Sequence, residues 1–224
     1  MIKEKGKGLL IVISGPSGTG KGTICSRVVN EMENIKISIS ATSRCKRENE
    51  VNGKDYYFIT KEEFEEKIKN NEFLEYAIVH SNQYYGTPKA KIEEDLNNGT
   101  SVILEIDIQG ALKVKDIISE AIFIFIMPPS MKVLKQRLIN RNTESLDKVM
   151  ERFKTAYKEL NEFKKYNYVV VNDDLDEAVE KVKSIIVSEK CRVDRIEDIY
   201  LDTIEEEIHE ELMEQEFDNK DITI

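Results

Sequence analysis

Cysteine is scarce in this sequence, and long apolar runs and broad basic stretches are absent. The three cysteines, Cys25, Cys45 and Cys191, are far apart and in no metal-like spacing, which argues against a disulfide framework and against a zinc site. The apolar run near the N-terminus stops at Ser14, which makes it too short for a membrane span, and it lacks a small-residue cleavage site. We therefore expect a reduced, cytoplasmic protein without a membrane partner.

Charge is unevenly distributed along the chain. The formal net charge is −10, but residues 196–224 contain 12 acidic residues and one lysine, so this tail carries −11 and residues 1–195 carry +1. Because a nucleic-acid-binding surface needs a broad basic face, we expect no nucleic-acid partner. A composition of 40% hydrophobic and 34% charged residues is typical of a globular domain of this length.

The most informative stretch is Ser14-Gly-Pro-Ser-Gly-Thr-Gly-Lys-Gly-Thr23, which lies between an apolar run and a helical pattern. Its spacing is that of a phosphate-binding loop, in which backbone N–H groups and a helix N-terminus face an anion while the lysine reaches the outer phosphates. An ordinary turn is the alternative, but strand, lysine and helix in register favour the loop. One irregularity is Gly22, because the expected hydroxyl residue comes one place later. The predicted phosphate contacts are Gly15, Pro16, Ser17, Gly18, Thr19, Gly20, Lys21, Gly22 and Thr23.

Strand-like and helix-like patterns alternate along the rest of the chain, which predicts a parallel sheet flanked by helices. Two acidic residues, Glu105 and Asp107, follow a buried strand and would lie at the carboxyl edge, where such sheets bind ligands. The predicted strands cover residues 9–13, 35–40, 56–59, 73–79, 102–107, 121–127 and 168–171. The predicted helices cover residues 21–33, 60–70, 86–98, 131–139, 145–166 and 175–190.

Over residues 8–192, the order and spacing of these motifs resemble the guanylate kinases, a family of nucleoside monophosphate kinases. The resemblance implies an α/β P-loop kinase fold with a parallel five-stranded core sheet, a small GMP-binding subdomain and a helical lid. It assigns the core to residues 1–34 and 97–195, the lid to about 137–152 and the subdomain to 35–96. The implied reaction is ATP-dependent phosphorylation of GMP and dGMP in purine nucleotide metabolism, with Mg²⁺ held mainly by ATP phosphates and water.

The acceptor half of the resemblance is carried by the segments Ser40–Arg47 and Phe73–Tyr76. Guanidinium groups bind phosphate oxygens bidentately, and one carboxylate can accept both the ring N–H and the amine of guanine. Read in isolation, the first segment is a solvated basic loop and Glu75 an exposed strand carboxylate, but their order along the chain favours binding roles. The resemblance implies that Arg44, Arg47, Tyr56 and Tyr85 bind the GMP phosphate, and that Ser40, Glu75, Thr87 and Asp107 bind the base.

Phosphoryl transfer needs positioning and neutralisation of charge more than covalent chemistry. The resemblance implies that Lys21 follows the transferred group and that the lid arginines Arg141 and Arg152 close over it. Arg137 belongs either to this cluster or to the C-terminal dipole of its own helix. Asn172 lies either near the adenine or at a helix N-cap.

The chain departs from the family pattern at a few positions. Lys46 replaces a proline and Asn49 a glycine in the basic loop, Asn142 replaces a lid glycine, and Glu105 stands where aspartate is common. One extra residue in His80–Gln83 raises the question whether Tyr85 keeps its place.

Beyond residue 195, apolar residues recur every four positions, which predicts an acidic amphipathic helix over 196–224. Such a helix suits either a solvated terminus or packing against its own domain or against a second subunit, which would form a homo-oligomer. Two other functions stay open as alternatives. One is a non-catalytic guanylate-kinase-like interaction module, which typically lacks the phosphate loop, and the other is a small-molecule kinase with a sugar-phosphate acceptor.

Overall fold

The core of the protein is a parallel five-stranded sheet, as expected. The computed structural model describes residues 2–4, 6–79, 83–140 and 146–199. Within them, the strand order of the core sheet is β10-β9-β2-β8-β3, and every neighbouring pair is parallel. The strands, in chain order, are β2 (Leu10–Ser14), β3 (Ile35–Ile37), β8 (Ser101–Glu105), β9 (Ile122–Met127) and β10 (Tyr168–Val171).

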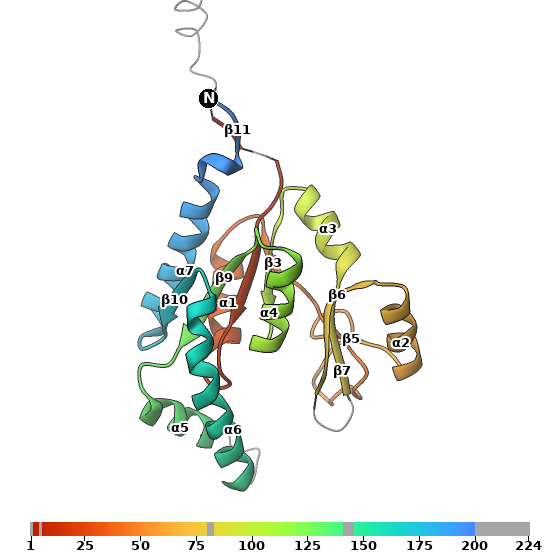
Figure 1. Cartoon of the computed structure of the whole chain (residues 1–224), viewed down its shortest axis with the longest axis vertical. Helices are drawn as coiled ribbons and strands as arrows, with labels where there is room; N and C mark the ends of the chain where they lie inside the picture. Colours follow the sequence, from red (N-terminus) through yellow and green to blue (C-terminus); the bar gives the residue numbers. More distant parts are fainter. Residues whose placement is uncertain (1, 5, 80–82, 141–145, 200–224) are drawn as a thin grey trace, which may run out of the picture.

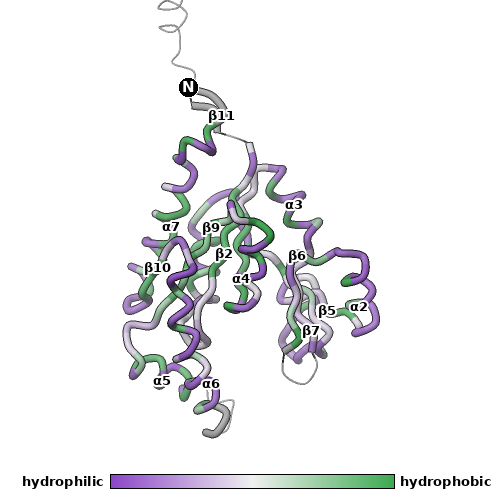
Figure 2. Tube along the Cα trace, in the orientation of Figure 1, coloured by the Kyte–Doolittle hydropathy of each residue, from purple (hydrophilic) through white to green (hydrophobic). Residues whose placement is uncertain are grey.

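The central strand β2 is buried along its whole length, because helices cover both faces of the sheet. Ile11 and Ile13 pack with α1 (Lys21–Glu31) and α7 (Leu175–Lys190) on one face. On the other face, alternate β2 residues pack with α3 (Lys89–Asn97) and α4 (Ile108–Ile117). Figure 2 shows the resulting contrast between hydrophobic central strands and largely hydrophilic outer helices.

A second, four-stranded sheet forms a subdomain beside the core, with strand order β5-β4-β7-β6. A small hydrophobic core of Ala41, Phe64 and Tyr84 joins this sheet to its helix. That helix begins with a complete capping box between Thr60 and Glu63. The elements are β4 (Ala41–Thr42), β5 (Tyr57–Phe58), α2 (Lys61–Lys69), β6 (Phe73–Val79) and β7 (Gln83–Pro88).

Two helices form the lid on the other side of the core sheet (Figure 1). α5 (Met131–Ile139) and α6 (Leu146–Glu159) share a hydrophobic cluster that includes Leu134, Leu138 and Val149. A 3-10 helix, η1 (Leu160–Lys165), continues α6, so the long predicted helix tightens over its last turns. No helix within the described ranges combines the length and apolar character that a membrane crossing requires.

The predicted helix start at Gly86 was wrong, because residues 83–88 form strand β7 between β4 and β6. A Cβ atom on Gly86 would lie 2.8 Å from the Phe64 ring, so this glycine permits close packing rather than starting a helix.

The boundaries of the subdomain in the structure also differ from the predicted ones. β3 belongs to the core sheet although residue 35 was expected to begin the subdomain, and α3 contributes the buried Ile92 to the core.

Residues 196–199 form a strand where a helix was expected. β11 (Ile196–Ile199) follows the 3-10 helix η2 (Val193–Arg195) and pairs antiparallel with β1 (Ile2–Glu4). The partner strand comes from the opposite end of the chain, so the local helical periodicity could not reveal it. The rest of the predicted tail helix lies outside the described residues.

Candidate active site

The phosphate-binding loop leaves the carboxyl end of β2 and enters α1, as its sequence predicts. Gly15 and Gly20 have φ values of +144° and +89°, a region that side chains disfavour. A Cβ atom on Gly15 would lie 2.3 Å from the Ile126 carbonyl oxygen, and one on Gly20 would lie 2.4 Å from the amide nitrogen of Asn172. Both positions therefore require glycine for conformation and for space.

Lys21 lies at the mouth of this loop. Its Nζ donates to the carbonyl oxygens of Gly15, at 2.6 Å, and Pro16, at 3.0 Å. The Thr19 hydroxyl donates to the same Pro16 carbonyl at 2.9 Å. The loop is thus closed on itself by three hydrogen bonds, with a cationic group at its centre.

Asn172, which directly follows the edge strand β10, connects that end of the sheet to the loop. Its buried side-chain amide donates to the Thr19 carbonyl at 2.7 Å. The backbone carbonyl of Asn172 accepts from Nη2 of Arg137 at 3.1 Å. The N-cap of α7 is Asp174, so Asn172 is not the helix cap. Nη1 of Arg137 is buried without a hydrogen-bond partner among the described residues, and such a group suits an acceptor from a ligand.

The lid contacts the loop through Arg152, which donates to the Ser17 hydroxyl. Arg141 lies outside the described residues. On the opposite side, a Cβ atom on Gly22 would lie 3.2 Å from Oε1 of Glu105, so this carboxylate lies beside the first turn of α1. In the described part of the chain, no group of three or more His, Cys, Asp or Glu residues could hold a metal ion.

At one end of the subdomain, a cluster of polar and aromatic side chains surrounds Arg44. Its Nε donates to the Tyr85 hydroxyl at 3.1 Å, and its guanidinium lies over the Tyr56 ring, 5.2 Å from the centroid. Nη1 and Nη2 donate to the two carboxylate oxygens of Glu50 at 2.7 and 2.6 Å. Arg47 is exposed, and its guanidinium makes no hydrogen bond or ion pair within the described ranges. The structure therefore holds one of the two predicted arginines in place and leaves the other exposed.

Toward the other end of the subdomain sheet lies Glu75, which is only 8% exposed. Its Oε1 accepts from the Thr87 hydroxyl at 2.7 Å, and these two residues are cross-strand partners in β6 and β7. Burial, followed by the nearby charge of Asp107, raises the pKa of Glu75, although the Thr87 bond opposes the shift. Gly110 permits this arrangement, because a Cβ there would lie 3.1 Å from Glu75 and 3.3 Å from Asp107. Asp107 also caps α4 by accepting from the Gly110 N–H at 2.7 Å.

Ser40 lies half-buried between β3 and β4, and its carbonyl accepts from the Tyr57 N–H at 2.9 Å. The position of Tyr85 is also defined, because β6 and β7 pair without a break from Val79↔Gln83 to Glu75↔Thr87. The extra residue of the chain therefore falls in the 80–82 connection, which lies outside the described residues, and Tyr85 still reaches Arg44.

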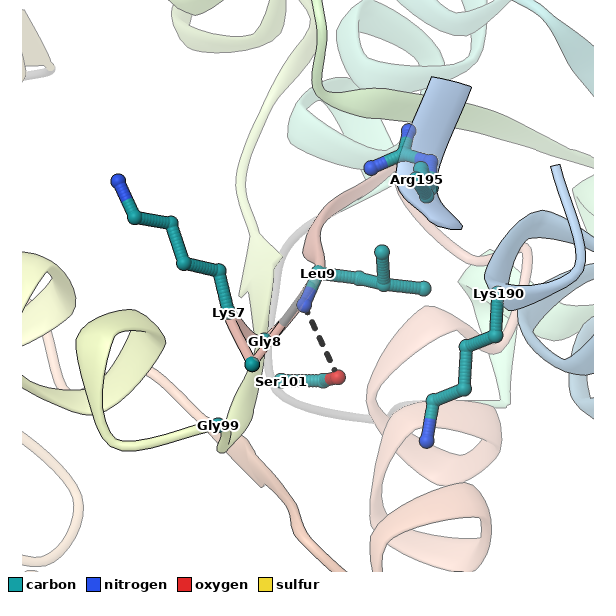
Figure 3. A pocket seen from close by; sticks show the side chains of 8 residues that line it. Lys7, Gly8, Leu9, Gly99, Ser101, Lys190 and Arg195 are labelled. Carbon is teal, nitrogen blue, oxygen red and sulfur yellow. Dashed lines mark hydrogen bonds between the residues drawn. The ribbon is translucent and has the colours of Figure 1, made fainter. Parts of the chain in front are cut away.

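Glu50 is the main site residue that the sequence did not reveal. Read alone, it is one acidic residue in a polar loop, and only its three-residue spacing from Arg47 hints at a side-chain contact with the backbone. A cavity at the opposite end of the sheet is lined by none of the predicted site residues. Figure 3 shows the side chains of Lys7 and Lys190 extending in different directions there, so they do not converge on one anion.

A glycine-rich loop after the central strand of a parallel sheet, a lysine at its mouth and an arginine-bearing lid define a P-loop kinase. The neighbouring subdomain, with a cationic end and a buried carboxylate, suits a phosphorylated acceptor.

Comparisons with known proteins define the family. The sequence profile described as guanylate kinase matches residues 7–189. A guanylate kinase of Clostridium tetani is 61% identical over 206 residues, covering 92% of this chain and 98% of that protein. One of Clostridium acetobutylicum is 58% identical, with coverage of 92% and 97%. The crystal structure of guanylate kinase from Anaplasma phagocytophilum has a TM-score of 0.72 at 32% identity and covers 95% of this chain and 99% of that one. The chain belongs to the guanylate kinase family.

Proposed function

We propose that this chain transfers the γ-phosphoryl group of ATP to GMP, and to dGMP, through the residues of the site described above. The observation that carries the proposal is the buried carboxylate of Glu75, hydrogen-bonded to Thr87 in a sheet whose other end holds Arg44. A monophosphate acceptor with a guanine base matches both ends. The intact phosphate loop argues against a binding module, and the joint presence of Ser40, Glu75 and Tyr85 argues against a sugar-phosphate acceptor.

The donor half binds ATP through the phosphate loop. The backbone N–H groups of Gly15 and residues 17–20, with the N-terminus of α1, bind the β- and γ-phosphates, and Lys21 exchanges its loop carbonyls for phosphate oxygens. Asn172 holds the loop in shape, and Arg137 next to it carries a buried N–H that suits a nucleotide acceptor atom.

The acceptor half selects guanine at Glu75. The ring N–H and the exocyclic amine of guanine donate to this carboxylate, with Ser40, Thr87 and Asp107 around the base. Adenine lacks this donor pair, so bound AMP would leave a buried carboxylate unpaired, which costs about 1–3 kcal/mol or more.

Transfer then requires an oxygen of the GMP phosphate to approach the γ-phosphorus in line. The bond from that oxygen to phosphorus forms as the bond to the β–γ bridging oxygen breaks, and ADP leaves with the charge. Lys21 follows the transferred group, and Arg152, Arg137 and Arg141 neutralise charge and exclude water when the lid closes.

Mg²⁺ fits this site mainly through ATP phosphates and water. Gly22 supplies no hydroxyl, and Glu105 is the carboxylate beside the first turn of α1 that could orient the water shell. When bound, the ion supplies charge neutralisation and orientation of the phosphates.

A substrate panel tests the proposal. The purified protein with ATP and Mg²⁺ is assayed for ADP formation with GMP, dGMP, AMP, CMP and UMP. We expect GMP to exceed AMP in kcat/KM by at least about 100-fold, the discrimination that unpaired buried acceptors provide. Equal rates with AMP would refute the base-recognition role of Glu75, and no turnover with any monophosphate would refute the reaction.

A further inference from the structure

Glu50 belongs to none of the ATP or GMP contacts proposed above, yet it makes the closest charge pair of the basic loop. Its two carboxylate oxygens accept from Nη1 and Nη2 of Arg44 at 2.7 and 2.6 Å. Oε2 also accepts from the backbone N–H of Arg47 at 2.8 Å. One side chain therefore contacts both arginines that are proposed to bind the GMP phosphate.

The Arg44 side chain makes four hydrogen bonds to described residues. Of its five N–H groups, Nε donates to Tyr85, Nη1 donates to Glu50 and to the Cys45 carbonyl, and Nη2 donates once to Glu50. The remaining N–H of Nη2 donates to no residue among those described. It lies on the edge that Nη2 shares with Nε, next to the Tyr85 hydroxyl, which accepts from Nε. Glu50 occupies the other edge, between Nη1 and Nη2.

We propose that Glu50 is a positioning residue that binds the Nη1–Nη2 edge of the Arg44 guanidinium. The Nε–Nη2 edge of Arg44, together with the Tyr85 hydroxyl, then faces the GMP phosphate. The same carboxylate fixes the turn that carries Arg47. This inference rests on the proposed function. Because the phosphate approaches a different edge of the guanidinium, it binds beside Glu50 without displacing it.

Two further observations support this role. Lys46 and Asn49 stand in this loop where a stiffening proline and glycine would otherwise restrict it, and the contacts of Glu50 to Arg44 and to the Arg47 N–H span the same segment. Arg44, and then the Arg47 N–H, lower the pKa of Glu50 to about 2, so the carboxylate stays ionised across the neutral range. The contact is therefore present whenever the enzyme works.

The change in phosphate affinity on removal of the Glu50 carboxylate distinguishes a positioning role from a simple effect of charge. Removing Glu50 makes the site more positive by one charge, which by Coulomb attraction would strengthen phosphate binding. If Glu50 positions Arg44, its removal weakens binding instead, and only for ligands that carry the phosphate.

The experiment compares wild-type protein with Glu50→Gln and Glu48→Gln by calorimetric binding of GMP and of guanosine, and by KM for GMP and ATP. Glu48 is exposed in the same loop, so its variant removes one charge without an Arg44 contact. We expect Glu50→Gln to raise Kd and KM for GMP by at least about tenfold, the loss of one well-oriented charge-assisted contact. Its guanosine Kd, ATP KM and kcat at saturating GMP stay within about twofold, and Glu48→Gln matches wild type.

Unchanged or tighter GMP binding by Glu50→Gln would overturn the positioning role and indicate that the carboxylate competes with phosphate. Equal losses for GMP and guanosine, or a lower melting temperature with a parallel rise in ATP KM, would indicate a structural role and also overturn it. If wild-type protein bound GMP no better than guanosine, the proposed phosphate site itself would be wrong. That outcome is distinct, because it does not involve the variant.

Discussion

The donor loop and the acceptor subdomain are built by different means for the same proposed task, the binding of phosphate. The donor loop uses backbone groups in fixed, glycine-dependent conformations, anchored by the buried amide of Asn172. The acceptor subdomain uses charged side chains held by other side chains, with Glu50 against Arg44 at one end and Thr87 against Glu75 at the other. The first design is decided by the local sequence, and the second by contacts that only the fold creates.

The carboxylates of Glu50 and Glu75, at the two ends of the acceptor subdomain, differ in the direction in which the protein shifts their pKa values. Arg44 lowers the pKa of Glu50, because its charge is already paired in the free protein. Burial raises the pKa of Glu75, because removal from water disfavours its charged form. In the proposed site, the phosphate end is therefore organised before GMP binds, whereas the base end gains donors from the ligand. Base selectivity and phosphate positioning should respond separately to substitution.

The largest effect is expected at the donor loop, from Lys21→Ala. Without its ammonium group, the charge on the transferred phosphoryl group has no protein cation at the loop mouth, and kcat should fall by at least about 10²–10³-fold. GMP binding, measured by calorimetry, should stay within about twofold, because no acceptor contact involves this residue. Lys69→Ala, on the exposed end of α2, is the control. Substantial turnover by Lys21→Ala would remove the donor loop from the chemical step.

Next in size is Glu75→Gln at the base end. The amide keeps an acceptor for Thr87 but donates where guanine also donates, so kcat/KM for GMP should fall by about 10–150-fold, equivalent to about 1.5–3 kcal/mol. KM for ATP should be nearly unchanged. A rise in both KM values would mean that the two halves are not independent.

The same variant should be more stable than wild type at neutral pH. The raised pKa means that the folded protein holds the Glu75 proton more tightly than the unfolded chain, whose pKa is near 4.5. Wild-type stability therefore falls as pH rises through the interval between the two pKa values, and Gln cannot titrate. The melting temperature of Glu75→Gln should exceed that of wild type by a few °C at pH 7, where 1 kcal/mol corresponds to about 2–4 °C. The difference should vanish near pH 4, and a difference independent of pH would contradict the burial argument.

Most of the core fold could be predicted because its signals are local. The continuous apolar run of β9 and the capping residues Thr60, Ser130 and Asp174 lie within a few residues of the elements they define. β7 was missed because Gly86 and Pro88 resemble the start of a helix, and only its pairing with β4 and β6 makes it a strand. β11 was missed for the same reason, since its partner strand is nearly 200 residues away.

The site residues likewise separate into those that the local sequence could assign and those that depend on tertiary contacts. The loop glycines and Lys21 could be assigned from spacing alone, and Glu75 from its place in a multi-motif resemblance. The anchoring role of Asn172 could not, because Asn, Asp173 and Asp174 are all plausible helix caps and only the structure shows Asp174 in that position. The contact of Glu50 with Arg44 could not be predicted, because a bidentate ion pair depends on the path of the loop between Arg44 and Arg47.

Asn172→Ala should have a smaller effect that is confined to the donor half. It removes the bond to the Thr19 carbonyl, worth about 1 kcal/mol, and loosens the loop. KM for ATP should rise by about fivefold while Kd for GMP stays constant, as measured by initial rates and calorimetry. Asn167→Ala, an asparagine at the other end of β10 whose side chain accepts from the Phe123 N–H, is the matched control. An equal change in GMP binding would show that the anchor acts on both substrates.

The smallest effect on catalysis is expected from Thr60→Ala, which tests whether the two halves also unfold separately. Losing the N-cap of α2 should cost about 1 kcal/mol locally, which is about a fivefold increase in exchange rate for the α2 amides if they open within the subdomain. Amides of α1 should exchange at the wild-type rate, because the small core around Phe64 is separate from the cluster that holds α1. Hydrogen exchange followed by mass spectrometry measures both, with Glu66→Gln on the same helix as control. A matching acceleration in α1 would mean that donor and acceptor halves open as one unit, in spite of their different construction.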